Sequence, residues 1–206
     1  MIAIVDYGLG NVQAFMDIYK RLNLPVTAAR TASELAGAQR IILPGVGAFD
    51  WAMGRLIASG MRDKLDEMVI GNKVPVLGVC VGMQLMASVS EEGKLPGLGW
   101  VDGEVKLFEN SNFSHKTHLP HMGWNDLTSH SDDGIFASLP SPRFYFLHSY
   151  FFCASNEENV IATSSYGTQF TSAIRQKNIF GTQFHPEKSH MWGVRLLENF
   201  AKMPLC

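Results

Sequence analysis

The sequence predicts a three-layer α/β fold, in which helices cover both faces of a mostly parallel central sheet and antiparallel strands are added in the second half. Two observations support this. Before about residue 97, short runs that are apolar on both faces alternate with segments of helical periodicity, which is typical of covered parallel strands. After it, glycines, prolines and aromatic residues separate short alternating segments, which is typical of antiparallel strands.

Strands and helices are expected to alternate in the first half. Apolar residues spaced i, i+3, i+4 and i+7 predict a helix over 12–22. Ser33 is expected to cap a short helix with Glu34 in its first turn. One or two helices are expected over 49–71, and another begins at 82–88. The strands are expected at residues 2–5, 25–29, 40–43 and 74–79, the third stopped by Pro44-Gly45.

Five short strands and a closing helix are expected in the second half. The helix covers 191–203, because Val194, Leu197 and Phe200 share one side. No repeat or linker interrupts the chain, so a single domain over 1–206 is expected. The strands are expected at residues 103–108, 143–152, 160–164, 170–175 and 179–184.

Composition excludes several classes of protein. Of 206 residues, 46% are hydrophobic and 17% charged, which is too apolar for a disordered chain. A net charge of −2 without a basic run argues against nucleic-acid binding. No apolar stretch is long enough to span a membrane, and Asp6 follows too closely for a signal peptide. The three cysteines, Cys80, Cys153 and Cys206, predict reduced thiols in the cytoplasm.

Cys80 is the first candidate for chemistry. The sequence Gly78-Val79-Cys80-Val81-Gly82 lies between an expected strand and an expected helix. This is the pattern of a nucleophile elbow with Cys in place of Ser, and its small flanking residues suit a sharp turn. A helix N-terminus favours the thiolate, and the N–H of Val81 is placed to face an oxyanion. The pattern favours a reactive cysteine over a buried, inert one.

The second candidate is His185-Pro186-Glu187, after an apolar segment. Residues i and i+2 of an extended chain point the same way, and Pro186 favours an extended His185. Glu187 is therefore expected to hold the imidazole in one tautomer while the other nitrogen faces a nucleophile. Alone, the motif is more typical of a surface turn. Its pairing with an elbow cysteine is what favours a triad.

A glycine loop, Pro44-Gly45-Val46-Gly47, follows the third expected strand. In an open parallel sheet, sites gather at the carboxyl ends of the strands, where this loop and Cys80 would meet. Gly45 and Gly47 allow the backbone to turn N–H groups towards an oxyanion. The alternative is an ordinary turn.

Gly8-x-Gly10 follows the first strand, as in dinucleotide-binding loops. The third glycine of that pattern is missing, and no acid follows about 20 residues on. A tight strand–helix turn is therefore favoured over a nucleotide site, and no cofactor is expected.

Three histidines, His115, His118 and His121, recur every third residue and suggest metal ligation. Pro120 opposes a helix there, and no Cys or acid completes a ligand set. No metal site is therefore expected.

Together, the Cys80 elbow, His185-Pro186-Glu187 and the 44–47 loop resemble the class I, triad-type glutamine amidotransferases. Further segments are similar to the glutaminase subunits of imidazole glycerol phosphate synthases, and the resemblance runs from the first strand to the last helix. These segments are Asp-Tyr-Gly-x-Gly-Asn at 6–11, Gly-Met-Gln-Leu at 82–85, Ser-Glu-Glu at 90–92, Leu-Pro-His-Met-Gly-Trp-Asn at 119–125, Tyr-Phe-Leu-His-Ser-Tyr at 145–150 and Gly-Thr-Gln-Phe-His-Pro-Glu-Lys-Ser at 181–189.

The resemblance implies a reaction and a set of roles. Cys80 would attack the side-chain amide carbon of glutamine, His185 would carry the proton to the departing ammonia, and Glu187 would orient His185. Water would then cleave the thioester. The resemblance further implies oxyanion contacts from Val46, Gly47 and Val81, and glutamine contacts from Gly47, Gln84, Glu92, Ser149 and Tyr150.

The resemblance also implies a partner. Ammonia would pass, in a heterodimer, to a (β/α)8-barrel cyclase that makes imidazole glycerol phosphate and an aminoimidazole carboxamide ribotide in histidine biosynthesis. Asn11, Trp124 and Lys188 match the interface of that family. The low charged fraction agrees with an interface.

Three other functions are weighed. Similar glutaminases feed a sugar amidotransferase in surface-polysaccharide pathways, and this acceptor stays open. A papain-like peptidase is less favoured, because its cysteine lies near the mature N-terminus whereas Cys80 follows an internal strand. A non-catalytic binding module is not supported, because all three triad residues are present.

Overall fold

The computed structural model describes residues 1–109, 118–130 and 134–204, and a mixed eight-stranded sheet is its centre. The strands are β1 (Ile2–Val5), β2 (Val26–Ala29), β3 (Arg40–Gly45), β4 (Val76–Cys80), β5 (Val89–Ser90), β6 (Gly103–Leu107), β7 (His121–Asp126), β8 (Thr128–Ser129), β9 (Arg143–His148), β10 (Tyr150–Ala154), β11 (Val160–Tyr166), β12 (Thr168–Gln176) and β13 (Ile179–Thr182). The α-helices are α1 (Val12–Arg21), α2 (Ala32–Leu35), α3 (Phe49–Ala58), α4 (Arg62–Asp66), α5 (Val81–Gln84) and α6 (His190–Lys202). A π-helical turn (Glu67–Gly71) and the 3-10 turns Gly134–Phe136, Glu157–Asn159 and Pro186–Lys188 complete the described elements.

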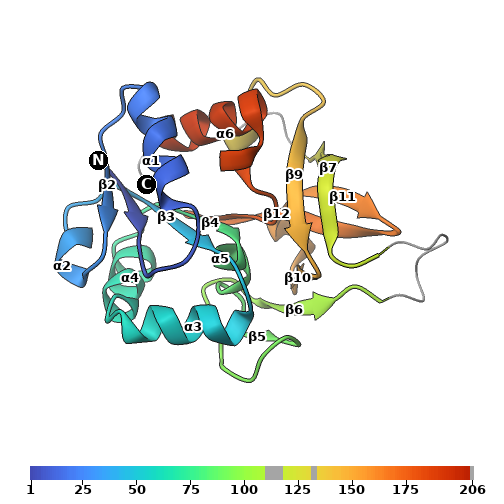
Figure 1. Ribbon diagram of the computed structural model, residues 1–206, viewed down its shortest axis with the longest axis horizontal. Coiled ribbons are helices and arrows are strands. Elements are labelled where there is room, and N and C mark those ends of the chain that lie inside the picture. Colours follow the sequence, from blue (N-terminus) through green and yellow to red (C-terminus); the bar gives the residue numbers. More distant parts are fainter. Residues whose placement is uncertain (110–117, 131–133, 205–206) are drawn as a thin grey trace.

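The central sheet confirms the predicted fold class. Its strand order is β2-β1-β3-β4-β13-β12-β11-β8, with parallel pairing from β2 to β13 and antiparallel pairing beyond. Helices α1 and α6 lie on one side of the parallel strands, and α3 and α4 on the other (Figure 1). Every residue of β1 and β4 is buried, as expected for strands covered on both faces.

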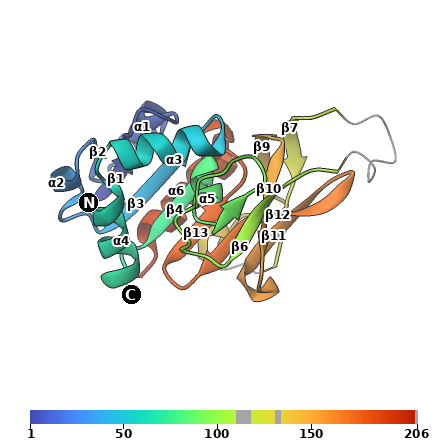
Figure 2. The same ribbon diagram turned by 90° about the horizontal axis from the view of Figure 1, so that it is seen from below.

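Two smaller sheets stand beside the antiparallel end, so not all later strands join the central sheet as predicted. One has the order β10-β6-β5, and the other pairs β7 with β9 (Figure 2). The segment predicted as one strand over 143–152 is two strands, because the chain changes sheets between His148 and Tyr150. β7 was not predicted.

β13 corrects a second expectation in part: it pairs antiparallel to β12, as predicted, but parallel to β4 on its other side. All four of its residues are buried, which fits a central strand covered on both faces. This position brings the segment that follows β13 to the same edge of the sheet as Cys80.

Three element boundaries also differ from expectation. Thr31, not Ser33, caps α2, because its side chain accepts the N–H of Glu34 at 3.3 Å. β3 does not stop before Pro44 but continues through Gly45, which lies opposite Cys80 in the ladder. The helix after Cys80 is a single turn, because the carbonyls of residues 85–87 accept N–H groups from 98–101 instead.

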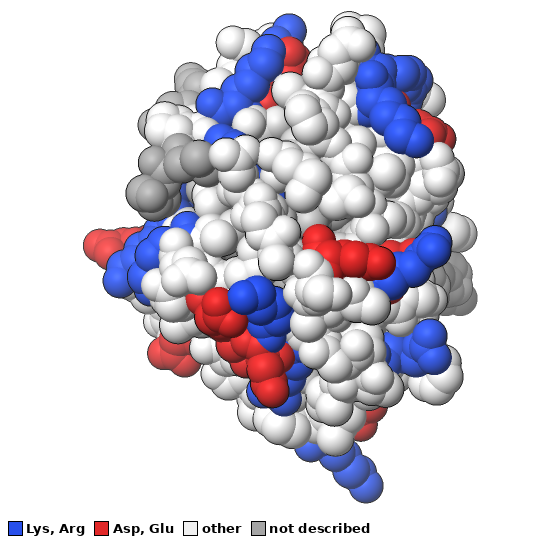
Figure 3. Space-filling view, turned by 90° about the vertical axis from the view of Figure 1, so that its left-hand side faces the viewer, with Lys and Arg blue, Asp and Glu red and all other residues white. Residues whose placement is uncertain are grey.

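The described residues contain no helix that is both long and apolar enough to cross a membrane. On the face shown in Figure 3, Lys and Arg side chains are interspersed with Asp and Glu. Neither sign forms an extended patch among the described residues of that face.

Candidate active site

Cys80 ends β4 in a strained conformation. Its φ of 55° and ψ of −114° lie where side chains larger than glycine are rarely found. Such strain persists only where the surroundings impose it, and it is common at functional sites. The strand–turn–helix expected around Cys80 is therefore present, with its side chain buried at the carboxyl edge of the parallel strands.

Gly82 makes this turn possible. A Cβ atom at position 82 would lie 1.9 Å from the carbonyl oxygen of Leu43, in the neighbouring strand β3. Only glycine therefore allows the elbow to pack against β3. The same close approach brings the glycine loop after β3 next to Cys80, as the sequence predicted.

His185 and Glu187 form a buried pair beside the elbow. The Nδ1 atom of His185 lies 2.9 Å from Oε1 of Glu187, and both side chains are almost fully buried. The backbone N–H of His185 donates to the carbonyl of Tyr145, and Ser189 Oγ donates to the carbonyl of His185. With Nδ1 engaged by Glu187, Nε2 is the ring nitrogen that is left for the interaction of His185 with Cys80.

These contacts favour the protonated imidazole. Burial by itself lowers the pKa of His185, but the interactions with Cys80 and Glu187 outweigh burial and hold the pKa well above its ordinary value. An imidazole that is stabilised in its protonated form readily takes a proton from a thiol. The arrangement suits a cysteine nucleophile with a histidine base.

A cavity of about 270 Å³ opens above the pair. It brings together the predicted oxyanion residues, the predicted glutamine contacts and His185, and it extends to Lys188. Its lining consists of Val46, Gly47, Val81, Gln84, Glu92, Pro120, Leu147, His148, Ser149, Tyr150, His185 and Lys188. Cys80 and Glu187 are not part of this lining.

Gln183 is a site residue that the sequence reasoning did not assign. Its amide nitrogen lies 3.7 Å from Cys80 Sγ, and its amide oxygen accepts a hydrogen bond from Gln84. Gln183 lies just after β13, two residues before His185, where the chain bends. The i, i+2 argument that paired His185 with Glu187 applies to an extended chain, so it gives no signal for this residue.

Glu92 joins the cavity to the loop after β3. Its Oε2 accepts the N–H of Phe49, the first residue of α3, at 2.9 Å. Burial raises the pKa of the Glu92 carboxyl above its ordinary value. Gly47, in the same loop, has a φ of +84°, a conformation that favours glycine.

The three predicted interface residues have different surroundings. Trp124 and Lys188 are exposed and flank Tyr145, with the Lys188 ammonium 5.8 Å from the Tyr145 ring centroid. The Trp124 ring also stacks on His190. Asn11 caps α1, and its side chain accepts the N–H of Ala14.

The histidine series and the Gly8-x-Gly10 turn were the two motifs for which no site was expected. In the described part of the chain, no group of three His, Cys, Asp or Glu residues is arranged to hold a metal. Of the three spaced histidines, His115 lies outside the described residues, and His121 pairs with His148. Cys206 also lies outside the described residues. Gly10 permits close packing, because a Cβ there would lie 2.6 Å from Pro44.

Comparison with known proteins agrees with the fold. Residues 3–203 match the family model described as glutamine amidotransferase class-I. A glutamine amidotransferase crystal structure superposes with a TM-score of 0.75 at 20% identity, covering 98% of this chain and 99% of the other. One from Thermotoga maritima gives 0.63 at 18% identity, covering 96% and 80%. The chain belongs to the class I glutamine amidotransferase family.

Curated relatives are more specific. Imidazole glycerol phosphate synthase subunit HisH of Bdellovibrio bacteriovorus is 56% identical over 204 residues, covering 98% of this chain and all of the relative. The HisH subunits of Leptospira interrogans and Leptospira borgpetersenii are 50% and 48% identical with the same coverage.

Proposed function

We propose that this chain is the glutaminase subunit of an imidazole glycerol phosphate synthase in histidine biosynthesis. It hydrolyses L-glutamine to glutamate and ammonia and supplies the ammonia to a cyclase subunit. The observation that carries the proposal is the buried Cys80–His185–Glu187 set at the base of a cavity, in a chain 56% identical along its length to such a subunit. A match over 3–203 supports treating the chain as one domain.

Cys80 and His185 act one after the other on the side-chain amide of glutamine, while Glu187 orients His185. The sulfur of Cys80 attacks the amide carbon, and His185 takes the thiol proton. The tetrahedral oxyanion is stabilised by backbone N–H groups of Val81 and of the 46–47 loop. When the carbon–nitrogen bond breaks, His185 gives its proton to the departing ammonia and leaves a thioester. Water, activated by His185, then releases glutamate and restores the thiol.

Hydrogen bonds already present limit how the cavity can hold glutamine. Both N–H groups of the Gln84 amide are used, by the carbonyl of Tyr150 at 3.0 Å and by Gln183 at 3.1 Å. Gln84 therefore offers substrate its amide oxygen. Glu92 uses Oε2 for Phe49 and keeps Oε1 for the α-ammonium group. Ser149, Tyr150 and Gly47 complete the contacts, towards the α-carboxylate and the reacting amide.

The partner is a cyclase subunit that we propose to be a (β/α)8 barrel, joined as a heterodimer at the mouth of the cavity. The exposed positions of Trp124 and Lys188 support this location, because Lys188 lines the cavity and both residues flank Tyr145. Asn11 is a further residue that we propose for this interface. Transfer within the heterodimer keeps ammonia from bulk water. A cytoplasmic location is supported by the free thiols of Cys80 and Cys153.

A sugar amidotransferase as acceptor is not favoured, because the relatives at 48–56% identity are imidazole glycerol phosphate synthase subunits. Membership of the glutamine amidotransferase family likewise disfavours a papain-like peptidase.

The test is glutamine hydrolysis by the purified chain, alone and with the histidine-pathway cyclase of the same organism plus that cyclase's ribotide substrate. We expect strong stimulation by the loaded cyclase and complete loss in Cys80→Ala, while the cyclase keeps its ammonia-dependent activity. Hydrolysis without stimulation would contradict the proposed acceptor. Activity that survives in Cys80→Ala would contradict the nucleophile.

A further inference from the structure

His121 and His148 form a buried pair that the proposed chemistry does not use. They are register partners in the β7–β9 ladder, and Nδ1 of His121 lies 2.9 Å from Nε2 of His148. Both side chains are buried, and His148 also lines the cavity. The sequence pattern had placed His121 among possible metal ligands, yet its ring faces another imidazole.

The neighbours of the pair fix the direction of each hydrogen bond. Nδ1 of His148 lies 2.8 Å from the carbonyl oxygen of Tyr150, which only accepts, so this nitrogen carries the proton. In a neutral ring Nε2 of His148 then accepts from Nδ1 of His121. Nε2 of His121 accepts in turn from the amide nitrogen of Asn125, 3.3 Å away. Both rings are therefore Nδ1–H tautomers.

Burial keeps both rings neutral. It lowers the pKa of His148 to about 3 and that of His121 to about 4, and for His148 the neighbouring His121 and His185 act in the same direction. The two imidazoles stay neutral at neutral pH, so the donor and acceptor of each hydrogen bond do not change. We call this series of hydrogen bonds, from Asn125 through His121 and His148, the link.

The link continues to the nucleophile. The carbonyl of Tyr150 accepts from both His148 and Gln84, the Gln84 amide also donates to Gln183, and Gln183 donates to the sulfur of Cys80. The carbonyl of Leu147, on the other side of His148, lies 3.8 Å from the same sulfur. The hydrogen bond from His121 to His148 thus supports the cavity wall formed by residues 147–150.

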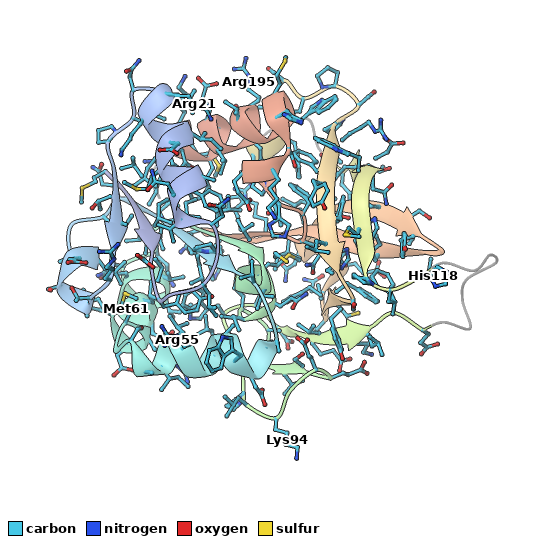
Figure 4. The ribbon with its side chains drawn as sticks, in the orientation of Figure 1. Arg21, Arg55, Met61, Lys94, His118 and Arg195 are labelled. Carbon is cyan, nitrogen blue, oxygen red and sulfur yellow. The ribbon has the colours of Figure 1, made fainter. Side chains whose placement is uncertain are left out.

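At its other end the link is anchored to β7 and β11. Asn125 also donates to the carbonyl of Ser165 at 2.9 Å, and the Tyr166 ring stacks on His121. The Tyr166 hydroxyl in turn donates to the carbonyl of His118, just before β7 (Figure 4 labels His118). Along β7 the exposed residue Met122 follows His121, and the exposed residue Trp124 precedes Asn125.

We propose that His121 and His148 are positioning residues, which hold the 147–150 wall of the glutamine cavity in place through the Tyr150 carbonyl. The inference rests on the proposed glutamine-binding function of that cavity. It requires the hydrogen bond from His121, not merely the packing of its ring.

Two substitutions at one position separate these roles. His121→Phe keeps a ring between Phe146 and Tyr166, which stack on His121 at centroid distances of 4.8 and 4.1 Å, but removes the donor. His148 is then left with either an unpaired nitrogen or a lone pair facing the Tyr150 carbonyl. His121→Asn loses the ring but keeps a donor, because Asn Nδ2 and His Nδ1 are equally far from Cβ along the side chain.

The readout is covalent labelling of Cys80 in the full chain by a diazoketone analogue of glutamine, compared with iodoacetamide. For His121→Phe we expect half-maximal labelling at an analogue concentration about ten times higher than for the unsubstituted chain. This is the size of effect expected from one unsatisfied buried polar group. Iodoacetamide labelling should stay unchanged, and His121→Asn should behave like the unsubstituted chain. Equal analogue labelling of all three chains, or a greater loss in His121→Asn than in His121→Phe, would overturn the inference.

Failure of the underlying function looks different, since the unsubstituted chain would then react no faster with the analogue than with a diazoketone lacking the amino-acid part. If His121→Phe does not fold, nitrogen-15 NMR of the unsubstituted chain tests the inference instead, because it reports the tautomers of His121 and His148. We expect the Nδ1–H tautomer for both histidines. An Nε2–H tautomer at either position would overturn the inference.

Discussion

At the scale of single residues, the conformation of the nucleophile Cys80 depends on one close backbone contact, between Gly82 and Leu43. Cys80 is held in a left-handed conformation, and Gly82 permits this by leaving room for the Leu43 carbonyl. The sequence pattern of small residues around Cys80 predicted this turn. It did not reveal Gln183 or the His121–His148 pair, because their importance arises from residues 27 to 103 positions away in sequence.

Gly82→Ala is expected to destabilise the fold by at least about 2 kcal/mol, because the added methyl group would meet backbone that cannot rotate away. Chemical denaturation measures the free energy of unfolding. Gly54→Ala is the matched control, since a Cβ at that position in α3 meets nothing within 4 Å. It should stabilise the helix by up to about 1 kcal/mol. Equal effects of the two substitutions would contradict the steric argument.

At the scale of elements, prediction was successful where a local pattern determines the structure. The spacing of apolar residues located α1 within a residue, and the apolar runs located β1 and β2. It failed where tertiary pairing decides. β3 runs through Pro44 and Gly45 because β4 continues beside it. The helix after Cys80 stops because the carbonyls of residues 85–87, which a further turn would use, accept N–H groups from 98–101.

The turn before β4 shows how a distant side chain fixes an element. Asn178 is buried just before β13, and its amide donates to the carbonyls of Val69, in the π-helical turn, and Val74. Its own carbonyl accepts the N–H of Val76, the first residue of β4. Asn178 thus connects the start of β13 to the start of β4, the strand that carries the nucleophile.

Asn178→Ala should therefore lower the free energy of unfolding by about 2–3 kcal/mol, because the buried carbonyl of Val69 and the partly buried carbonyl of Val74 lose their donor. Labelling of Cys80 by the glutamine analogue should change little, since the substitution lies at the far end of β4. Asn72→Ala, at an exposed position in the same turn, is the control, with an expected change within about 0.5 kcal/mol. A loss as large in Asn72→Ala as in Asn178→Ala would show that the buried amide is not the cause.

At the scale of the whole molecule, two groups of buried histidine act on stability in opposite pH ranges. His185 has a raised pKa, so its contribution to stability is full below the unfolded value of about 6.5 and is lost as pH rises. His121 and His148 have lowered pKa values, so their contribution is present above about 6.5 and is lost as pH falls. The net charge of −2 adds little repulsion at neutral pH.

Between pH 6.5 and 4, the unfolded chain therefore binds up to two more protons at these histidines than the folded chain does. Each such proton gives a slope of about 1.4 kcal/mol per pH unit in the free energy of unfolding. Denaturation at a series of pH values should show that the free energy of unfolding decreases as the pH is lowered from 6.5 to 4. In His121→Asn the slope should be smaller by about one proton, whereas His118→Asn, which removes an exposed imidazole, serves as the control. An undiminished slope in His121→Asn would mean that His121 is already protonated in the folded chain. The single donor direction from Asn125 through the two histidines to the Tyr150 carbonyl would then fail as well.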